Sequence, residues 1–448
     1  MALKSLHLLL HLLFLANGFC NSDLHFPQKI TISIPPAYDP NLHGRAFVLA
    51  SGKKHLPSFR AGLSLEAIAN NLYSCSLAVF LGGLKVWSSD HFSPFSPSKS
   101  CVLELTSNGV LQVHDDRGLV GWQTTTFSQQ VQRLLLEKTG NLVLMDAKNY
   151  TKWQSFDYPT DTMLRGQQLN APFSLTCLNY SFEVLHDMLR ISLNWRGQRY
   201  SYWELVPERN ISFARLGSMG LKLFDSNSRK VALITGSHSG KQSNRLLAMR
   251  RDGNLGLYYY SAVTREFQAS YQASNKPCEL PLPCGNYGIC TFSNSCSCVP
   301  LVSKYDDPDG FCGNGNAAAK MEELDGVDTV LSSSSLRLIN VSKEECASSC
   351  MDECSCVAAR HSGDGIWREC LHYGLVGGVR EVERGESGHS YWVKVLKGNE
   401  KSSGFEKTVV IIVGVFDGLV LCSIAGAILY CFIFFRKGFI SEQEFSEN

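Results

Sequence analysis

The sequence has almost no net charge. Its 42 lysine and arginine residues nearly balance its 41 aspartate and glutamate residues, so the formal net charge at pH 7 is +1. Proteins that bind nucleic acids usually carry a strongly basic stripe or patch. The balance therefore gives no reason to expect a nucleic-acid partner. The chain also lacks a disordered composition, because 44% of its residues are hydrophobic.

The common catalytic motifs are also missing. The sequence contains no HExxH motif, no phosphate-binding loop and no GxSxG nucleophile elbow. The stretch Gly236–Gly240 has the glycines of an elbow, but His238 stands at the nucleophile position. Paired acidic residues such as Asp115 and Asp116 lie in turn contexts, which gives a glycosidase little support. We predict a protein that is not an enzyme and needs no cofactor or metal.

Hydrophobic segments stand near both ends. Residues 1–22 combine an early lysine, a leucine-rich run and small residues, the pattern of a secretory signal peptide. Residues 408–435 form a 28-residue apolar stretch with one acidic residue, and about 20 such residues suffice to cross a bilayer. A basic pair opens the remaining tail, 436–448, which places the tail in the cytoplasm by the positive-inside rule. We expect a single-pass type I plasma-membrane protein with an extracellular N-terminus.

Cysteine is abundant. Three of the seventeen cysteines lie in the two hydrophobic segments, which leaves fourteen in the expected exterior. An even number in an oxidising compartment predicts a disulfide framework and not free thiols or zinc sites. Four N-glycosylation sequons agree with a secretory route, and they begin at Asn149, Asn179, Asn210 and Asn340.

Short strands joined by tight turns dominate from about residue 45 to residue 272. Alternating apolar and polar residues on both sides of a glycine or asparagine turn are typical of β-hairpins. Three of these hairpins look like copies of one motif, at 101–115, 133–147 and 245–260. The repetition predicts a mainly β fold.

The most specific pattern runs from Gly140 to Leu169 (GNLVLMDAKNYTKWQSFDYPTDTMLRGQQL). A GNLVL-D block followed by W-QSFD-PTDT-L-G resembles the bulb-type lectin ectodomain of plant S-locus glycoproteins and S-domain receptor-like kinases. The resemblance implies tandem bulb-lectin domains with a three-fold β-prism fold. We expect the first domain at 45–157 and a second, more diverged one at 158–273.

Five cysteines are concentrated between residues 278 and 298, and Cys312 follows. So small a segment cannot bury a core of its own, and cross-links substitute for one. Its CGNYGIC element resembles the EGF-like module of the same family, which we expect at 274–313. The resemblance implies three disulfides: Cys278–Cys290, Cys284–Cys296 and Cys298–Cys312.

The stretch 342–356 (SKEECASSCMDECSC) places Cys346 and Cys350 four residues apart, on one face of a helix. It resembles the helix of a PAN, or apple-like, domain, which implies an α+β domain at 335–397. The family pairing would be Cys346–Cys370 and Cys350–Cys356. The sequence leaves open the connectivity of the remaining exterior cysteines, Cys75, Cys101, Cys177 and Cys354.

The resemblance to bulb lectins also implies a sugar site, the strand motif QxDxNxVxY, whose alternate residues face one side of the strand. No hairpin carries the whole motif, and the first keeps none of it. The other two supply five candidate carbohydrate-binding residues: Asn141, Val143, Asp252, Asn254 and Tyr258. The alternative is that Asp252 and Asn254 serve only an Asp-Gly-Asn turn.

The expected membrane helix has candidate contact residues of its own. Gly414 and Gly418 have the GxxxG spacing that lets two helices pack closely. Asp417 adjoins this face and is a candidate for pairing with a polar residue of a partner helix. The alternatives are that glycine is merely common in membrane spans and that Asp417 reaches the lipid headgroups.

We therefore predict a non-enzymatic cell-surface receptor-like glycoprotein. It would recognise an extracellular glycan or protein ligand, form homodimers, or act as co-receptor to a receptor kinase, because a tail of thirteen residues is too short for a kinase domain. Two alternatives stay open. One is a membrane-tethered decoy or cell-wall structural glycoprotein, and the other is a genuine mannose- or glycan-binding lectin.

Overall fold

The structure is a computed structural model of the whole chain. It describes residues 23–25, 28–51, 57–237, 244–299, 319–363, 368–383, 389–396, 423–426 and 428. The chain divides into two compact units. Almost all described residues belong to the first, which comprises Met1–Val299 and Glu323–Val393, and the second comprises Pro300–Glu322 and Lys394–Asn448.

Several sequence expectations fall outside the described residues. These are the signal peptide at 1–22, the tail at 436–448 and the helix contacts Gly414, Asp417 and Gly418. The expected span at 408–435 is described only at 423–426 and 428. Within the described part of the chain, no helix is both long enough and apolar enough to span a membrane.

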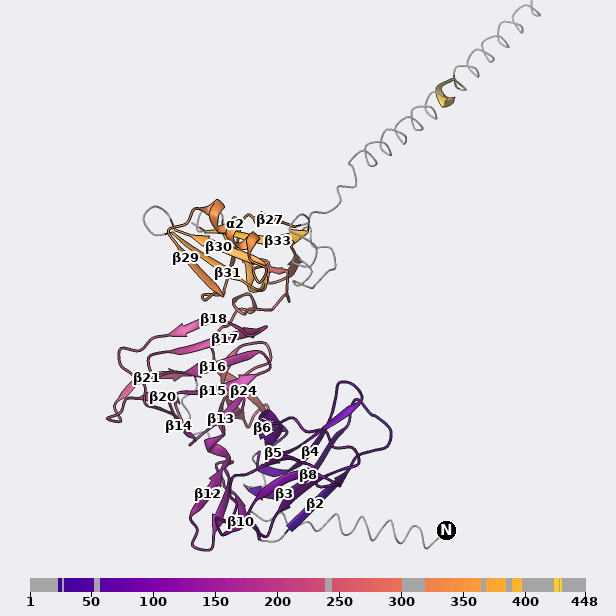
Figure 1. The fold of residues 1–448 in the computed structure, drawn as a ribbon, viewed down its shortest axis with the longest axis vertical. Coiled ribbons are helices and arrows are strands. Elements are labelled where there is room, and N and C mark those ends of the chain that lie inside the picture. Colours follow the sequence, from indigo (N-terminus) through magenta and orange to yellow (C-terminus); the bar gives the residue numbers. More distant parts are fainter. Residues whose placement is uncertain are drawn as a thin grey trace, which may run out of the picture. The chain divides into compact units, whose positions relative to one another are not determined.

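The first half of the first unit is built from three antiparallel sheets of four strands each, drawn in indigo to violet in Figure 1. One sheet contains β3 (His43–Ser51), β4 (Phe59–Ile68), β5 (Leu72–Leu81) and β6 (Leu84–Ser88). The second contains β2 (Gln28–Ser33), β7 (Ser100–Leu105), β8 (Leu111–Asp115) and β9 (Val120–Gln123). The third contains β1 (Asp23–His25), β10 (Val131–Leu136), β11 (Leu142–Asp146) and β12 (Thr151–Gln154).

These three sheets repeat one tryptophan position. Trp87, Trp122 and Trp153 come from β6, β9 and β12, the last strand of each sheet. Their rings pack edge to face with centroids 5.8 to 6.0 Å apart. Edge-to-face packing at this separation is favourable for aromatic rings. The three sheets therefore meet around a shared core, to which each contributes the same residue.

The hairpins expected from the sequence are present in the sheets. Residue Cys101 pairs with Asp115, Val131 with Asp146, and Arg245 with Tyr259. The turn of the second hairpin requires glycine, because Gly140 has φ +87° and an added Cβ would lie 2.4 Å from the Phe59 ring.

Strands β1 and β2 and the start of β3 lie before residue 45, where the sequence places the start of the first domain. Strand β1 pairs with β10, and strand β2 pairs with β7. Such distant partners cannot be read from local alternation.

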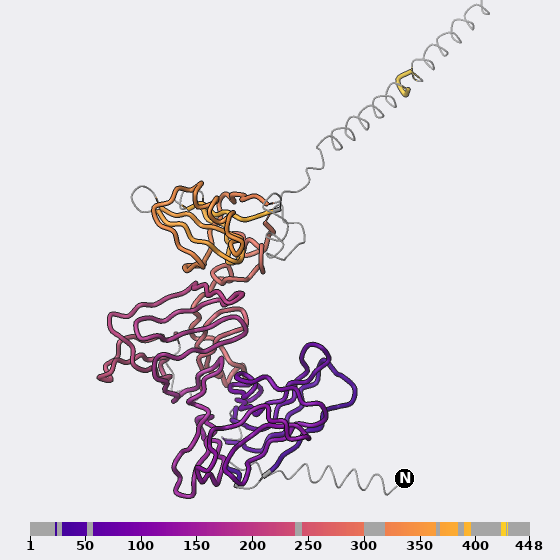
Figure 2. The backbone as a smooth tube through the Cα atoms, viewed as in Figure 1, coloured from indigo at the N-terminus to yellow at the C-terminus, as the bar shows by residue number. Residues whose placement is uncertain are grey.

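A second set of three four-stranded sheets follows, drawn in magenta and pink, and the chain trace in Figure 2 passes through it next. The first contains β13 (Thr162–Leu164), β22 (Arg245–Met249), β23 (Leu255–Ser261) and β24 (Glu266–Gln272). The second contains β14 (Gln168–Asn170), β19 (Phe213–Leu216), β20 (Gly220–Phe224) and β21 (Lys230–Thr235). The third contains β15 (Phe173–Cys177), β16 (Tyr180–Val184), β17 (Leu189–Trp195) and β18 (Gln198–Leu205).

The remaining strands form two sheets. The first joins β26 (Cys296–Cys298), β25 (Gly288–Cys290), β32 (Val379–Glu381) and β28 (Val327–Thr329). The second joins β27 (Ala319–Leu324), β33 (His389–Leu396), β30 (Ala358–Ser362), β31 (Glu369–Tyr373) and β29 (Leu336–Ile339). Strand β25, in the expected module 274–313, pairs in parallel with β32, in the expected module 335–397.

Helix α2 (Lys343–Asp352) lies against the second of these sheets. Ser342 and Glu345 form a capping box at its start, each side chain bonding the other's backbone N–H. Cys346 and Cys350 are fully buried on the helix face that meets the sheet. The sequence pattern of Ser342, Glu345 and the cysteine spacing is therefore sufficient to predict this helix and its buried face.

Four disulfides join the pairs that the family resemblance implies: Cys278–Cys290, Cys284–Cys296, Cys346–Cys370 and Cys350–Cys356. A fifth joins Cys75 to Cys101, and Cys354 is also disulfide-bonded. The expected Cys298–Cys312 bridge is wrong, because Cys298 is a free thiol exposed on the edge strand β26. Cys177 is free as well, so the expectation of a framework without free thiols fails at two positions.

Candidate functional site

Asn141, a candidate sugar ligand, uses its side chain inside the fold. It lies directly before β11 and is 5% exposed. Its amide nitrogen donates to Gln154 Oε1 at 2.8 Å, and its oxygen accepts the backbone N–H of Phe156 at 3.2 Å. The amide therefore ties the start of β11 to the chain leaving β12. Val143, the next candidate, is 1% exposed and belongs to the interior.

Asn254 repeats this arrangement in the second set of sheets. It lies directly before β23, is 5% exposed, and bonds the chain leaving β24. Its oxygen accepts the backbone N–H of Ser274 at 3.1 Å, and its nitrogen donates to the Ser274 carbonyl at 2.6 Å. Asp252 accepts the backbone N–H of Asn254 at 3.0 Å, the bond of a turn. Both amides thus close equivalent corners of the two sheet sets.

Tyr258 fills the space that a valine of the motif would need. Glycine stands at that position, and an added Cβ on Gly256 would lie 2.5 Å from the Tyr258 hydroxyl oxygen. Arg250 donates to the same hydroxyl at 3.5 Å and forms an ion pair with Asp252 at 3.2 Å. The hydrogen bond to Tyr258 raises the pKa of Arg250. Arg250, Asp252 and Tyr258 occupy motif positions of this hairpin, and Arg250 therefore bonds both of the others.

The five candidate residues do not form one site. Asn141 and Val143 belong to the sheet of β11, whereas Asp252, Asn254 and Tyr258 belong to the hairpin of β22 and β23. The structure places the two groups in different sheet sets. Desolvated sugar hydroxyls must find hydrogen-bond partners, and the two asparagine amides already have protein partners.

A polar cluster that the sequence did not reveal lies where the two sheet sets meet. His91, from the 3₁₀ helix η1 (Ser89–His91), is 2.8 Å from the Thr176 hydroxyl of β15. Burial raises the pKa of Asp161, although Thr162 donates to its carboxylate. Burial also lowers the pKa of His91, and the Asp161 charge opposes that shift. The cluster joins segments 85 residues apart in the sequence.

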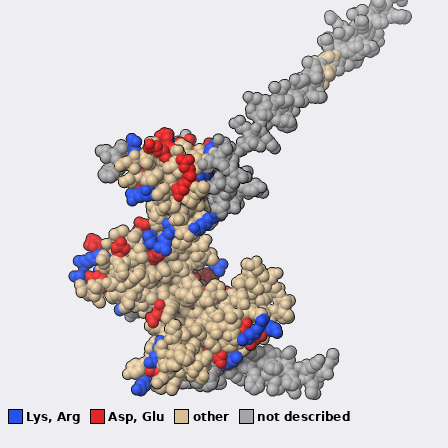
Figure 3. Space-filling model, viewed as in Figure 1, with Lys and Arg blue, Asp and Glu red and all other residues tan. Residues whose placement is uncertain are grey.

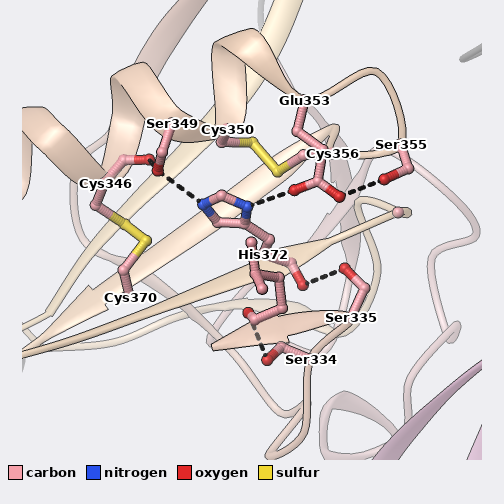
Figure 4. A network of polar contacts seen from close by, with 12 residues as sticks. Ser334, Ser335, Cys346, Ser349, Cys350, Glu353, Ser355, Cys356, Cys370 and His372 are labelled. Carbon is pink, nitrogen blue, oxygen red and sulfur yellow. Dashed lines mark hydrogen bonds and ion pairs between the residues drawn. A yellow bond between two sulfur atoms is a disulfide. The ribbon is translucent and has the colours of Figure 1, made fainter. Parts of the chain in front are cut away.

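A second buried network surrounds His372, which is completely buried (Figure 4). Its Nε2 lies 3.0 Å from the Ser349 hydroxyl and its Nδ1 lies 2.8 Å from a Glu353 carboxylate oxygen. Ser349 also donates to the Cys346 carbonyl at 3.0 Å. The order serine, histidine, glutamate resembles a hydrolase relay, but here it fastens the end of α2 to β31.

This network also contains groups with the spacing of metal ligands. Two sets combine His372 with cysteines: one with Cys346 and Cys370, the other with Glu353 and Cys356. All three cysteines are in disulfides, as the yellow bonds in Figure 4 show. Metals bind the thiolate form, so these sets cannot hold an ion while the bridges are intact.

Residues 85–177 match the family model described as D-mannose binding lectin. The matched range contains all three packed tryptophans and Asn141. The chain therefore contains a bulb-type lectin domain and is S-locus glycoprotein-like. Its lectin region lies within the two sets of four-stranded sheets that the fold contains.

Curated relatives of this lectin protein come from Arabidopsis thaliana. A PAN domain-containing protein is 26% identical and covers 59% of this chain and 58% of its own length. A G-type lectin S-receptor-like serine/threonine-protein kinase, SD3-1, is 28% identical over 65% of this chain and 41% of its own length. The chain thus spans about half the length of these relatives.

Among solved structures, the two-domain fetuin-binding lectin of Scilla campanulata is 15% identical. It matches 55% of this chain and 99% of its own length with a TM-score of 0.21.

Proposed function

We propose that this lectin protein is a non-enzymatic receptor-like glycoprotein of the plasma membrane. Its exterior recognises an extracellular ligand, and it acts as co-receptor to a receptor kinase. The observation that carries the proposal is the pair Asn141 and Asn254, whose amides hold the fold at the positions of the lectin motif. The chain keeps the lectin fold, but the asparagines at the positions of the sugar-binding motif hydrogen-bond to the protein itself. This favours a ligand other than mannose.

Surface features support an extracellular setting. The asparagines of the four sequons are all exposed, at Asn149, Asn179, Asn210 and Asn340. The disulfides agree with an oxidising compartment. Figure 3 shows lysine, arginine, aspartate and glutamate scattered over the visible face of the described residues without a continuous patch of one sign.

The segments after the lectin region support a role in protein contacts. We assign the cross-linked hairpin of β25 and β26 to an EGF-like module and the sheet under α2 to a PAN-like module, on their disulfide pattern. One relative is itself named for a PAN domain and several others for receptor-like kinases. We infer that the partner is a receptor kinase of this kind or a second copy of this chain.

Proximity labelling in living plant cells tests the proposal. The full-length chain carries a labelling enzyme on its C-terminal tail. The expected result is enrichment of a receptor kinase that decreases when Gly414 and Gly418 are changed to leucine or when Asp417→Asn is introduced. Arg117→Gln, on an exposed hairpin turn of the lectin region, is the control. Equal labelling of kinases by all variants, or none at all, would favour the tethered decoy instead.

A further inference from the structure

A cavity of about 300 Å³ lies beside the second lectin sheet set, at the junction with the cross-linked segments. Strand β18, the chain after β24, and strands β28 and β32 all contribute to its wall. Six of its lining residues carry the argument: Tyr202, Trp203, Asn254, Ser274, Glu279 and Arg380. This volume is at the lower end of the range typical of small-molecule sites.

Arg380 supplies an unused charge to this cavity. Its side chain is partly buried and lines the cavity. Its Nε is enclosed by protein, so only the terminal nitrogens of the guanidinium can meet a ligand. Among the described residues no carboxylate forms an ion pair with its guanidinium. The planar guanidinium fork matches a carboxylate with two parallel hydrogen bonds.

Glu279 lines the same cavity but does not neutralise Arg380. One of its carboxylate oxygens accepts the Ser274 hydroxyl at 2.7 Å, which fixes the side chain. Its other oxygen retains its capacity as an acceptor. The cavity thus presents one cationic fork and one separate anionic acceptor, so a ligand with a carboxylate at one end and hydroxyl donors at the other satisfies both.

Aromatic residues form a further part of the wall. Trp203 and Tyr202 are adjacent on β18 and both line the cavity. Tyr202 donates its hydroxyl to the Gly253 carbonyl, which holds its ring in place. Aromatic side chains offer a rigid apolar face together with a polar edge. A pyranose ring, with C–H groups on its faces and hydroxyls at its rim, fits such a wall better than a flexible amino acid does.

We propose that this cavity binds a uronic acid residue, with its carboxylate on Arg380, its ring hydroxyls on Glu279 and its ring against Trp203. The inference rests on the proposed function, because it names the chemical class of the extracellular ligand. The site is separate from the motif positions of the lectin hairpins except for Asn254. The oxygen of Asn254 is held by Ser274, so its role is to shape the wall.

The test uses the full-length protein in detergent micelles and calorimetric titration with the methyl glycoside of galacturonic acid. Its methyl ester and methyl galactoside are the ligand controls, because both lack the charged carboxylate. We expect the acid to bind about 10-fold to 100-fold more tightly than either control, the difference typical of a hydrogen bond to a charged group. Equal affinity for the acid and the ester, or no binding of the acid, would overturn the proposal.

Protein variants give an independent arm. Arg380→Gln should weaken binding of the acid about 10-fold or more and leave the weak binding of the ester unchanged. Arg117→Gln removes the same charge from an exposed turn and should bind as the unmodified protein does. If Arg380→Gln does not fold, the acid and ester comparison on the unmodified protein still decides. Tighter binding of free glutamate than of the uronate would also overturn the proposal.

Failure here is distinguishable from failure of the proposed function. If uronate does not bind but a receptor kinase is labelled, only the proposed ligand class is wrong. If uronate binds but no kinase is labelled, the cavity proposal holds and the co-receptor proposal is wrong.

Discussion

The side-chain oxygen of Asn141 accepts the backbone N–H of Phe156 at 3.2 Å. Asn254 does the same for Ser274 at 3.1 Å in the second sheet set. Each amide lies before the third strand of its sheet and reaches the chain that leaves the fourth. The asparagine of the lectin motif thus has the same structural role in both sheet sets, and its burial and its bonds to the protein oppose a role in sugar binding.

Asn141→Ala should destabilise the protein by about 1 to 3 kcal/mol, because it leaves the Phe156 N–H and the Gln154 amide without their buried partner. Thermal unfolding of the full-length protein measures the effect. Asn108→Ala changes an exposed asparagine in the turn of the first hairpin and is the matched control. Equal melting temperatures for the two variants would refute the structural role.

Loss of the Cys75–Cys101 bridge should cost about 3.5 kcal/mol, the value expected for a closed loop of this length. Both residues are at most 1% exposed in the core shared by the three lectin sheets. The test is chemical denaturation of the Cys75→Ala, Cys101→Ala double variant. Cys177→Ala removes a free thiol and should change stability far less. The reverse order of the two effects would contradict the assignment of the bridge.

Asp161→Asn should stabilise the protein at pH 7. Burial raises the pKa of Asp161, so the folded chain binds its proton more tightly than the unfolded chain does. For a carboxyl group with a raised pKa, stability is lost as the pH rises through the unfolded pKa, and the loss is complete above the folded pKa. The asparagine oxygen still accepts the Thr162 hydroxyl but carries no charge.

The expected rise in melting temperature at pH 7 should vanish at about pH 3, where the carboxyl is mostly protonated in both states. Asp187→Asn, an exposed aspartate in the turn between β16 and β17, should show no such dependence on pH. An Asp161→Asn protein that is less stable at pH 7 would mean that the electrostatic attraction between Asp161 and His91 outweighs the cost of burying the charge.

Ser349→Ala should destabilise the protein by about 1 to 3 kcal/mol, because His372 Nε2 is completely buried and loses its partner. Ser348→Ala, its exposed neighbour on α2, should change stability by no more than about 0.5 kcal/mol. Differential scanning calorimetry of both variants separates the two effects. An unchanged melting temperature for Ser349→Ala would show that Glu353 alone fixes the ring.

Local features of the fold could be predicted from the sequence. Alternation around a glycine turn is enough to predict the β7–β8, β10–β11 and β22–β23 hairpins, since each is formed by neighbouring residues. The four-residue spacing of Cys346 and Cys350 predicts α2 for the same reason. Family resemblance then supplies four of the disulfide pairs that spacing alone leaves open, but its Cys298–Cys312 pair is wrong and it leaves Cys75–Cys101 open.

Relations between distant segments could not be predicted. Strand β2 completes a sheet with β7 about seventy residues later, and β25 joins β32 about ninety residues later. The local pattern of apolar and polar residues does not indicate which distant strands pair. The role of Asn254 was open for the same reason, because its partner Ser274 is twenty residues away and follows a strand. The sequence suggested both a sugar ligand and a turn, and only the contacts distinguish them.

The most direct test of the central claim is calorimetric titration of the full-length protein with mannose. If the motif asparagines serve the fold, no saturable binding should occur up to about 10 mM, well above the 1 mM dissociation constant that corresponds to about −4 kcal/mol. Millimolar or tighter binding that disappears in a folded Asn254→Ala variant would contradict the claim and establish a mannose lectin.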